Sequence, residues 1–137
     1  MKVDVRECEA GPVVDAACAR ARGRTVRLTE RGDGKLHYEA FYEKYGHVSS
    51  VWLPVGDYST MIGAAWELVE AVAADKKLRE AFIDAMWELL DLDRYEEWDW
   101  DSYWIDPEAY WLLMTASPLD RCRAFLLAHG VTELEVE

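Results

Sequence analysis

The stretch Asp57–Ala73, DYSTMIGAAWELVEAVA, constrains the fold more than any other part of the chain. Its apolar residues follow the spacing of one helical face, and Ser59 or Thr60 stands where a hydroxyl can cap the first turn. Small residues at 63–65 would let a sheet or a second helix approach closely. We expect a central helix whose buried face consists of Ile62, Ala65, Trp66, Val69 and Val72.

Three segments before this helix are expected to form consecutive antiparallel strands. Residues 24–31 and 36–45 alternate apolar and polar side chains, and a Gly-Asp-Gly-Lys turn separates them. A third strand is expected over 48–55, where Pro54 favours the end or the edge of a strand. Residues 2–7 and the last seven residues alternate in the same way, which adds a short strand near each end of the chain.

Further helices are delimited by glycine, proline and capping residues. Asp75, Asp106 and Ser117 stand at expected N-cap positions. The expected helices cover 13–21, 76–91, 107–116 and 119–129. The length of 137 residues suits a single domain, 1–137, with its own core. These patterns predict an α+β fold with a single-layer antiparallel sheet of about three to five strands, covered by helices as in an α–β–α sandwich.

Charge limits the classes of partner. The formal net charge is −12, and it is uneven: residues 1–36 hold 8 Lys/Arg against 6 Asp/Glu, whereas residues 37–137 hold 7 against 21. A field of this sign repels the nucleic-acid backbone and favours basic protein surfaces. We expect a protein partner with a basic surface and no direct contact with nucleic acid. The alternative is that the acidity serves solubility alone.

No feature indicates a membrane, a cofactor or an exported protein. No apolar run approaches the ~20 residues of a membrane-spanning helix, and the first residues lack the apolar core of a signal peptide. Cys8, Cys18 and Cys122 form no CxxC pair, which predicts reduced thiols and a cytoplasmic location. The sequence leaves open whether the chain is a monomer or a homodimer.

The segment 91–108, DLDRYEEWDWDSYWIDPE, holds eight acids, three Trp and two Tyr. Such a mixture suits a presented surface better than a core. Its aspartates do not form a calcium loop, because the glycine and the twelfth-position glutamate of that pattern are missing. We expect neither metal nor cofactor. The expected partner-binding residues are Glu96, Glu97, Trp98, Asp99, Trp100, Asp101, Tyr103 and Trp104.

Catalytic candidates are weak. Cys122 and His129 are seven residues apart on one helix, about 10 Å along its axis, which is too far for direct activation of a thiol. Glu67 and Glu70 could form an acid/base pair on one helical side. Five arginines could gather into a basic patch or balance the acidic half within the fold; these are Arg20, Arg22, Arg24, Arg27 and Arg31.

The central stretch resembles the YSTDIAAAWEVVEKL signature of the phage ABA sandwich domain family. The matching residues are Tyr58, Ser59, Thr60, Ile62, Ala64, Ala65, Trp66, Glu67, Val69 and Glu70. SPLDRCRAFLLAHG at 117–130 is similar to the family's terminal APLAICRAALLA helix, and AGPVVDAACARARG at 10–23 is similar to its opening GRELDALVAEKVMG. The resemblance implies phage origin and an α–β–α sandwich, with no general activity or catalytic residues. Residues 75–117 depart from the family pattern: their sequence predicts helices and an acidic, aromatic segment, where the family usually has sheet.

Three functions follow as hypotheses. The first is a small phage-encoded protein in the host cytoplasm that binds a basic host protein. It would inhibit a nucleic-acid-handling or defence factor, and mimicry of the negative charge of nucleic acid is the specific form of this hypothesis. The second is a structural or accessory phage module without inhibitory activity, and the third is an enzyme of unrecognised type.

Overall fold

The computed structural model of the protein describes residues 1–30, 32–94 and 107–136. The α-helices are α1 (Pro12–Ala21), α2 (Ile62–Ala73), α3 (Lys76–Leu89), α4 (Pro107–Met114) and α5 (Pro118–Ala128). The strands are β1 (Lys2–Asp4), β2 (Val26–Glu30), β3 (Leu36–Tyr45), β4 (Val48–Pro54) and β5 (Glu133–Glu135). Two short 3-10 turns are η1 (Val5–Glu7) and η2 (Leu92–Arg94). The expected α+β class is confirmed.

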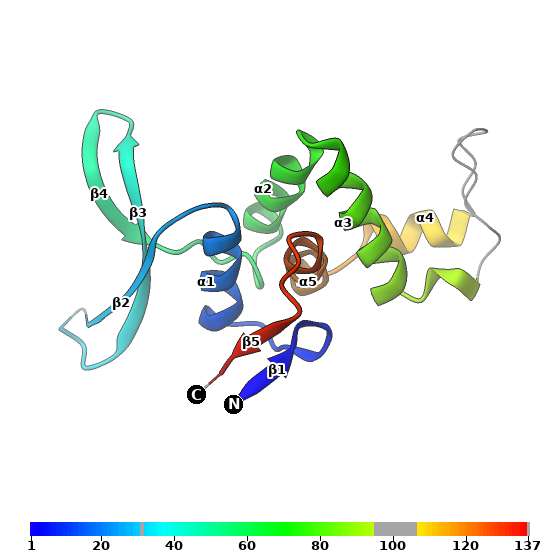
Figure 1. Ribbon diagram of the computed structural model, residues 1–137, viewed down its shortest axis with the longest axis horizontal. Helices are drawn as coiled ribbons and strands as arrows, with labels where there is room; N and C mark the ends of the chain where they lie inside the picture. Colours follow the sequence, from blue (N-terminus) through cyan, green and yellow to red (C-terminus); the bar gives the residue numbers. More distant parts are fainter. Residues whose placement is uncertain (31, 95–106, 137) are drawn as a thin grey trace.

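The described strands form two antiparallel sheets instead of one. The three-stranded sheet has the order β2-β3-β4, as the alternation and the glycine-rich turn predicted. β1 pairs with β5 in a separate ribbon, which brings the two ends of the chain together (Figure 1). β1 is shorter than expected because η1 follows at once: the Asp4 carboxylate accepts the N–H of Arg6 at 2.8 Å.

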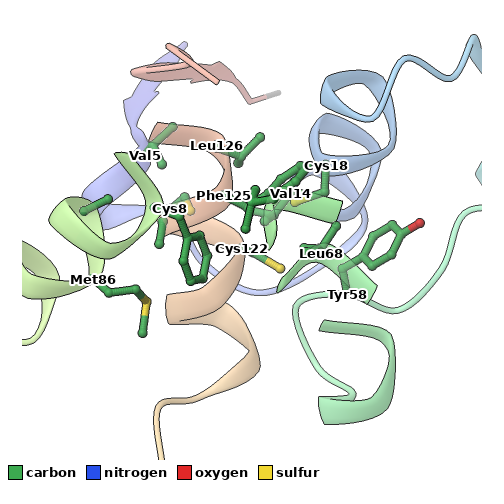
Figure 2. Close-up of a cluster of buried hydrophobic side chains, with 14 of the residues drawn as sticks. Val5, Cys8, Val14, Cys18, Tyr58, Leu68, Met86, Cys122, Phe125 and Leu126 are labelled. Carbon is green, nitrogen blue, oxygen red and sulfur yellow. The ribbon is translucent and has the colours of Figure 1, made fainter. Parts of the chain in front are cut away.

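The core lies among the helices, with α5 at its centre. α5 packs against α1, α2 and α3, and Figure 1 shows it enclosed by them. Cys122, Phe125 and Leu126 on α5 are fully buried. Figure 2 shows these side chains clustered with Val5 of η1, Val14 and Cys18 of α1, and Leu68 of α2. The three-stranded sheet lies to one side of this body, where α1 packs against β2 and β3.

Of the expected helix caps, two are confirmed, one is wrong, and Asp106 lies outside the described residues. The side chain of Asp75 accepts the N–H of Leu78 at 3.1 Å, and that of Ser117 accepts the N–H of Asp120 at 3.1 Å. At α2, however, Met61 occupies the N-cap position and provides no side-chain bond. The hydroxyl of Ser59 instead accepts the N–H of Gly11 at 2.9 Å, so it fastens the start of α1.

The buried face expected for α2 is partly wrong. Ala65 and Val72 are buried as expected, together with Leu68. Ile62 and Trp66 are instead 54% and 51% exposed. The reason is that the apolar residues of α2 form a face wider than its contact with the core, so the spacing alone does not say which part of that face is buried.

Candidate partner-binding surface

The eight residues expected to bind a partner all lie between 95 and 106, outside the described residues. They are Glu96, Glu97, Trp98, Asp99, Trp100, Asp101, Tyr103 and Trp104. The described chain reaches this segment through η2 and continues from it into α4. The candidate surface must therefore be built from the helices themselves.

An exposed apolar strip lies beside the buried face of α2. Met61, Ile62 and Trp66 are all more than half exposed, and we call them the outer α2 face. Ile62 and Trp66 are four residues apart, so they lie above one another on the helix. Glu67 and Glu70 are the two polar side chains within the twelve residues of this helix. α2 is thus apolar on its buried side and on its outer face.

The buried side chain of Arg121, on α5, contacts the ring of Trp66. Its guanidinium lies 5.6 Å from the centroid of the indole ring, a cation–π arrangement. It also donates to the carbonyl oxygens of Met114 at 3.1 Å and Ala116 at 3.3 Å, which end α4. Burial lowers the pKa of Arg121, because the charged form is desolvated. One buried cation therefore brings the end of α4 next to the outer α2 face.

α4 presents a second exposed apolar face. Tyr110, Trp111 and Met114 fall within one third of a helical turn's circumference and are each more than half exposed. Ala109, on the other side of this helix, is fully buried. Because Arg121 bonds Met114, this face adjoins Trp66 at the end of α4. Exposed apolar groups that gather in this way mark interaction sites more often than isolated ones do.

The carboxylates of α2 stand beside the outer α2 face. Glu67 forms an ion pair with Arg22 at 3.4 Å, and the same guanidinium donates to the hydroxyl of Tyr58 at 3.2 Å. Glu70 is exposed. Glu67 thus links α2 to the end of α1 through Arg22. This favours a structural role for Glu67 and does not favour an acid/base pair with Glu70.

The described arginines make contacts in several parts of the fold. Arg22 points to α2, as described above, whereas Arg27 lies on the three-stranded sheet. Arg27 donates to Glu39 at 2.9 Å and stacks 4.1 Å from the ring centroid of Trp52. Arg20 and Arg24 stack on Tyr38 and Tyr42. Arg31 lies outside the described residues. The described arginines thus serve contacts within the fold, as the alternative to an anion site predicted.

Cys122 and His129 belong to the core and its margin. Cys122 is fully buried, and the ring of His129 packs on that of Phe125 with centroids 4.6 Å apart. Burial lowers the pKa of His129, although Asp75 opposes this. Cys8, Cys18 and Cys122 are buried free thiols. Burial and the neighbouring thiol Cys122 raise the pKa of Cys18, which disfavours a reactive thiolate.

Asp15 is a buried polar residue that the sequence did not single out. Its carboxylate accepts the backbone N–H of Ser59 at 2.8 Å. Burial raises the pKa of Asp15 even though the bonds from Ser59 oppose this shift. It lines a cavity of about 190 Å³ together with His37, Tyr38 and Asp57. The signal that could have found it is an acid in the first turn of a helix that begins with proline.

The comparisons with known proteins add no relative. No protein-family model, curated protein or solved structure matches this chain. None of the helices in the described part of the chain is long and apolar enough to cross a membrane. Within residues 1–30, 32–94 and 107–136, no three His, Cys, Asp or Glu side chains are grouped to hold a metal ion.

Proposed function

We propose that this chain is a small acidic, phage-encoded protein that binds a basic host protein through the outer α2 face. The host protein would be a nucleic-acid-handling or defence factor, which the chain inhibits by occupying its basic surface. The acidic and aromatic residues of the segment 91–108 stay predicted contacts of the same partner. The proposal concerns binding, and it assigns no catalytic residue.

The observation that carries this proposal is the width of the apolar face of α2. An apolar helix face is normally buried over its whole width. Ala65, Leu68 and Val72 satisfy this requirement on one side, against the core. The outer α2 face, with Ile62 and Trp66, remains exposed to solvent. A partner that covers it would remove this apolar area from water, which is the main driving force of association.

The charge of the chain selects the kind of partner. Residues 37–137, which include α2 and α4, hold 7 Lys/Arg against 21 Asp/Glu. An apolar surface within such a field suits a partner whose own apolar patch is bordered by lysine and arginine. Proteins that handle nucleic acids display basic surfaces of this kind. Occupation of that surface by a protein with a net charge of −12 would exclude nucleic acid from it.

The test is capture from a bacterial host lysate with wild-type protein and two matched variants. Ile62→Asn/Trp66→Asn removes the outer α2 face, whereas Leu36→Asn/Val48→Asn changes exposed apolar residues of the three-stranded sheet. Leu36 and Val48 are 63% and 54% exposed, close to the values of the α2 pair. We expect one host protein to be retained by wild type and by the sheet variant, and to be lost with the α2 variant.

Binding of the captured protein must also depend on charge and compete with nucleic acid. We expect its retention to weaken as salt rises from 50 to 500 mM, because the attraction between exposed charges is screened. We further expect the purified partner to lose its affinity for nucleic acid when this chain is added. Equal capture by the two variants would contradict the proposed surface. An unchanged affinity of the partner for nucleic acid would contradict the inhibitory function.

A further inference from the structure

A second apolar feature lies where the two ends of the chain meet. A cavity of about 390 Å³ is lined by residues of the β1–β5 ribbon and by residues 7–14, which include the first turn of α1. Its floor consists of Cys8, Val14 and Leu134, which are buried. We call it the terminal pocket. Its volume lies at the lower end of the ~300–1,000 Å³ that small ligand sites occupy.

The terminal pocket is apolar within and acidic at its mouth. Val3, Val13 and Val136 form half-buried walls above the floor. The charged groups in its lining are the exposed carboxylates of Glu7 and Glu9 and the α-ammonium of Met1, whose charge is paired with Glu135 at 3.1 Å. The pocket is therefore suited to an apolar group that is bordered by positive charge.

The backbone around the floor is already engaged within the fold. The carbonyl of Cys8 accepts a hydrogen bond from the guanidinium of Arg123, and the N–H of Cys8 bonds the carbonyl of Val5. Burial raises the pKa of the Cys8 thiol although Arg123 opposes this, so the thiol is a neutral wall atom. The recognition offered by the floor is thus the burial of apolar surface.

We propose that the terminal pocket receives a leucine-sized apolar side chain of a protein segment whose neighbouring residues are lysine or arginine. Glu7 and Glu9 would pair with the flanking cations, while the apolar side chain displaces water from above Cys8, Val14 and Leu134. Charge argues against a second copy of this chain, because each copy carries a net charge of −12. The same charge argues against an anionic lipid surface. The site is distinct from the outer α2 face.

The probe is the acetylated and amidated pentapeptide KKLKK, titrated into the ¹⁵N-labelled full chain at low salt. We expect saturable shifts at the amide signals of Val3, Cys8, Val13 and Leu134. KKAKK lacks the large side chain, and we expect it to bind about 10-fold to 100-fold more weakly, as the loss of one buried leucine implies. EELEE retains the leucine with the opposite charge, and we expect no binding.

Two variants separate the apolar contact from the charges. Ala10→Trp places a large ring at the exposed rim of the pocket, and we expect it to block KKLKK. Glu7→Gln/Glu9→Gln removes two charges at the mouth, and we expect weaker binding with less dependence on salt. Glu80→Gln/Asp84→Asn removes two exposed charges from α3 and should leave binding unchanged.

The outcomes decide between this inference and the proposed function. Equal affinities for KKLKK and KKAKK, shifts centred away from the terminal pocket, or no binding would each overturn the pocket proposal. The Ile62→Asn/Trp66→Asn variant should bind KKLKK as wild type does. The peptide experiment therefore tests the terminal pocket separately from the binding proposed for the outer α2 face.

Discussion

The carboxylate of Asp15 accepts a 2.8 Å hydrogen bond from the backbone N–H of Ser59, 44 residues further along the chain. The Ser59 hydroxyl in turn accepts the N–H of Gly11 at 2.9 Å. These two bonds fasten the first turn of α1 to the segment that leads into α2. They fix the position of the start of α1 relative to the start of α2.

The Asp15 carboxyl predicts a specific pH dependence of stability. Burial raises its folded-state pKa, so the folded protein holds this proton more tightly than the unfolded chain, whose Asp pKa is about 3.9. Its contribution to the free energy of unfolding is therefore greatest below about pH 3.9 and falls as pH rises through the folded pKa. Asp15→Asn keeps an oxygen for the Ser59 N–H but cannot ionise.

We therefore expect Asp15→Asn to gain stability relative to wild type as pH rises from 3.5 to 7, measured by urea unfolding. Asp84→Asn, at an exposed position of α3, is the matched control and should show a much smaller change over this range. A difference between Asp15→Asn and wild type that stays constant with pH would contradict the raised pKa of Asp15.

Ser59 and Thr60 should differ in their effects on stability. Ser59→Ala removes the acceptor of the Gly11 N–H, and we expect the free energy of unfolding to fall by about 1–2 kcal/mol. Thr60 is exposed and does not cap α2, so Thr60→Ala should change it by less than about 0.5 kcal/mol. Urea unfolding measures both changes. A larger loss for Thr60→Ala than for Ser59→Ala would contradict this assignment and indicate that the Thr60 hydroxyl caps α2.

Leu68 and Ile62 provide a matched aliphatic pair on α2. Leu68 is fully buried, and we expect Leu68→Ala to lower the free energy of unfolding by about 2–5 kcal/mol. Ile62 lies on the outer α2 face, so Ile62→Ala should cost less than about 1 kcal/mol. Thermal and urea unfolding measure both. Equal losses would mean that Ile62 is core, as its spacing first indicated.

Arg121 should stabilise the end of α4. Arg121→Ala leaves the carbonyls of Met114 and Ala116 without their donor, and we expect a loss of about 1–3 kcal/mol. Arg79 is the control, because its exposed guanidinium also donates to a helix-end carbonyl, that of Ala73 at 3.1 Å. Arg79→Ala should cost less than about 0.5 kcal/mol. Faster hydrogen exchange in α4 should accompany the Arg121 change alone.

Local patterns predicted most of the described elements. Alternation located β3 over Leu36–Tyr45, and the caps Asp75 and Ser117 fixed the starts of α3 and α5. In these places the signal lies within a few residues of the element it determines. The antiparallel meander follows for the same reason, because its turns are short and rich in glycine.

Long-range contacts explain what the sequence did not predict. The Ser59 hydroxyl accepts the N–H of Gly11, so it does not act as the expected cap of α2. β1 pairs with β5, so these two strands form a sheet separate from the three-stranded one. The orientation of α2 was also open, because its apolar face is wider than its contact with the core. Its exposed residues Ile62 and Trp66 form the candidate surface, whereas the expected interface residues lie outside the described chain.

The outer α2 face is tested most directly by photo-crosslinking from position 62. A benzoyl-phenylalanine introduced at Ile62 should yield one discrete adduct with a host protein at 50 mM salt and much less at 500 mM. The same group at Leu36, which is also exposed, should yield no such adduct. The absence of an adduct from position 62, or an identical adduct from position 36, would contradict the proposed binding surface.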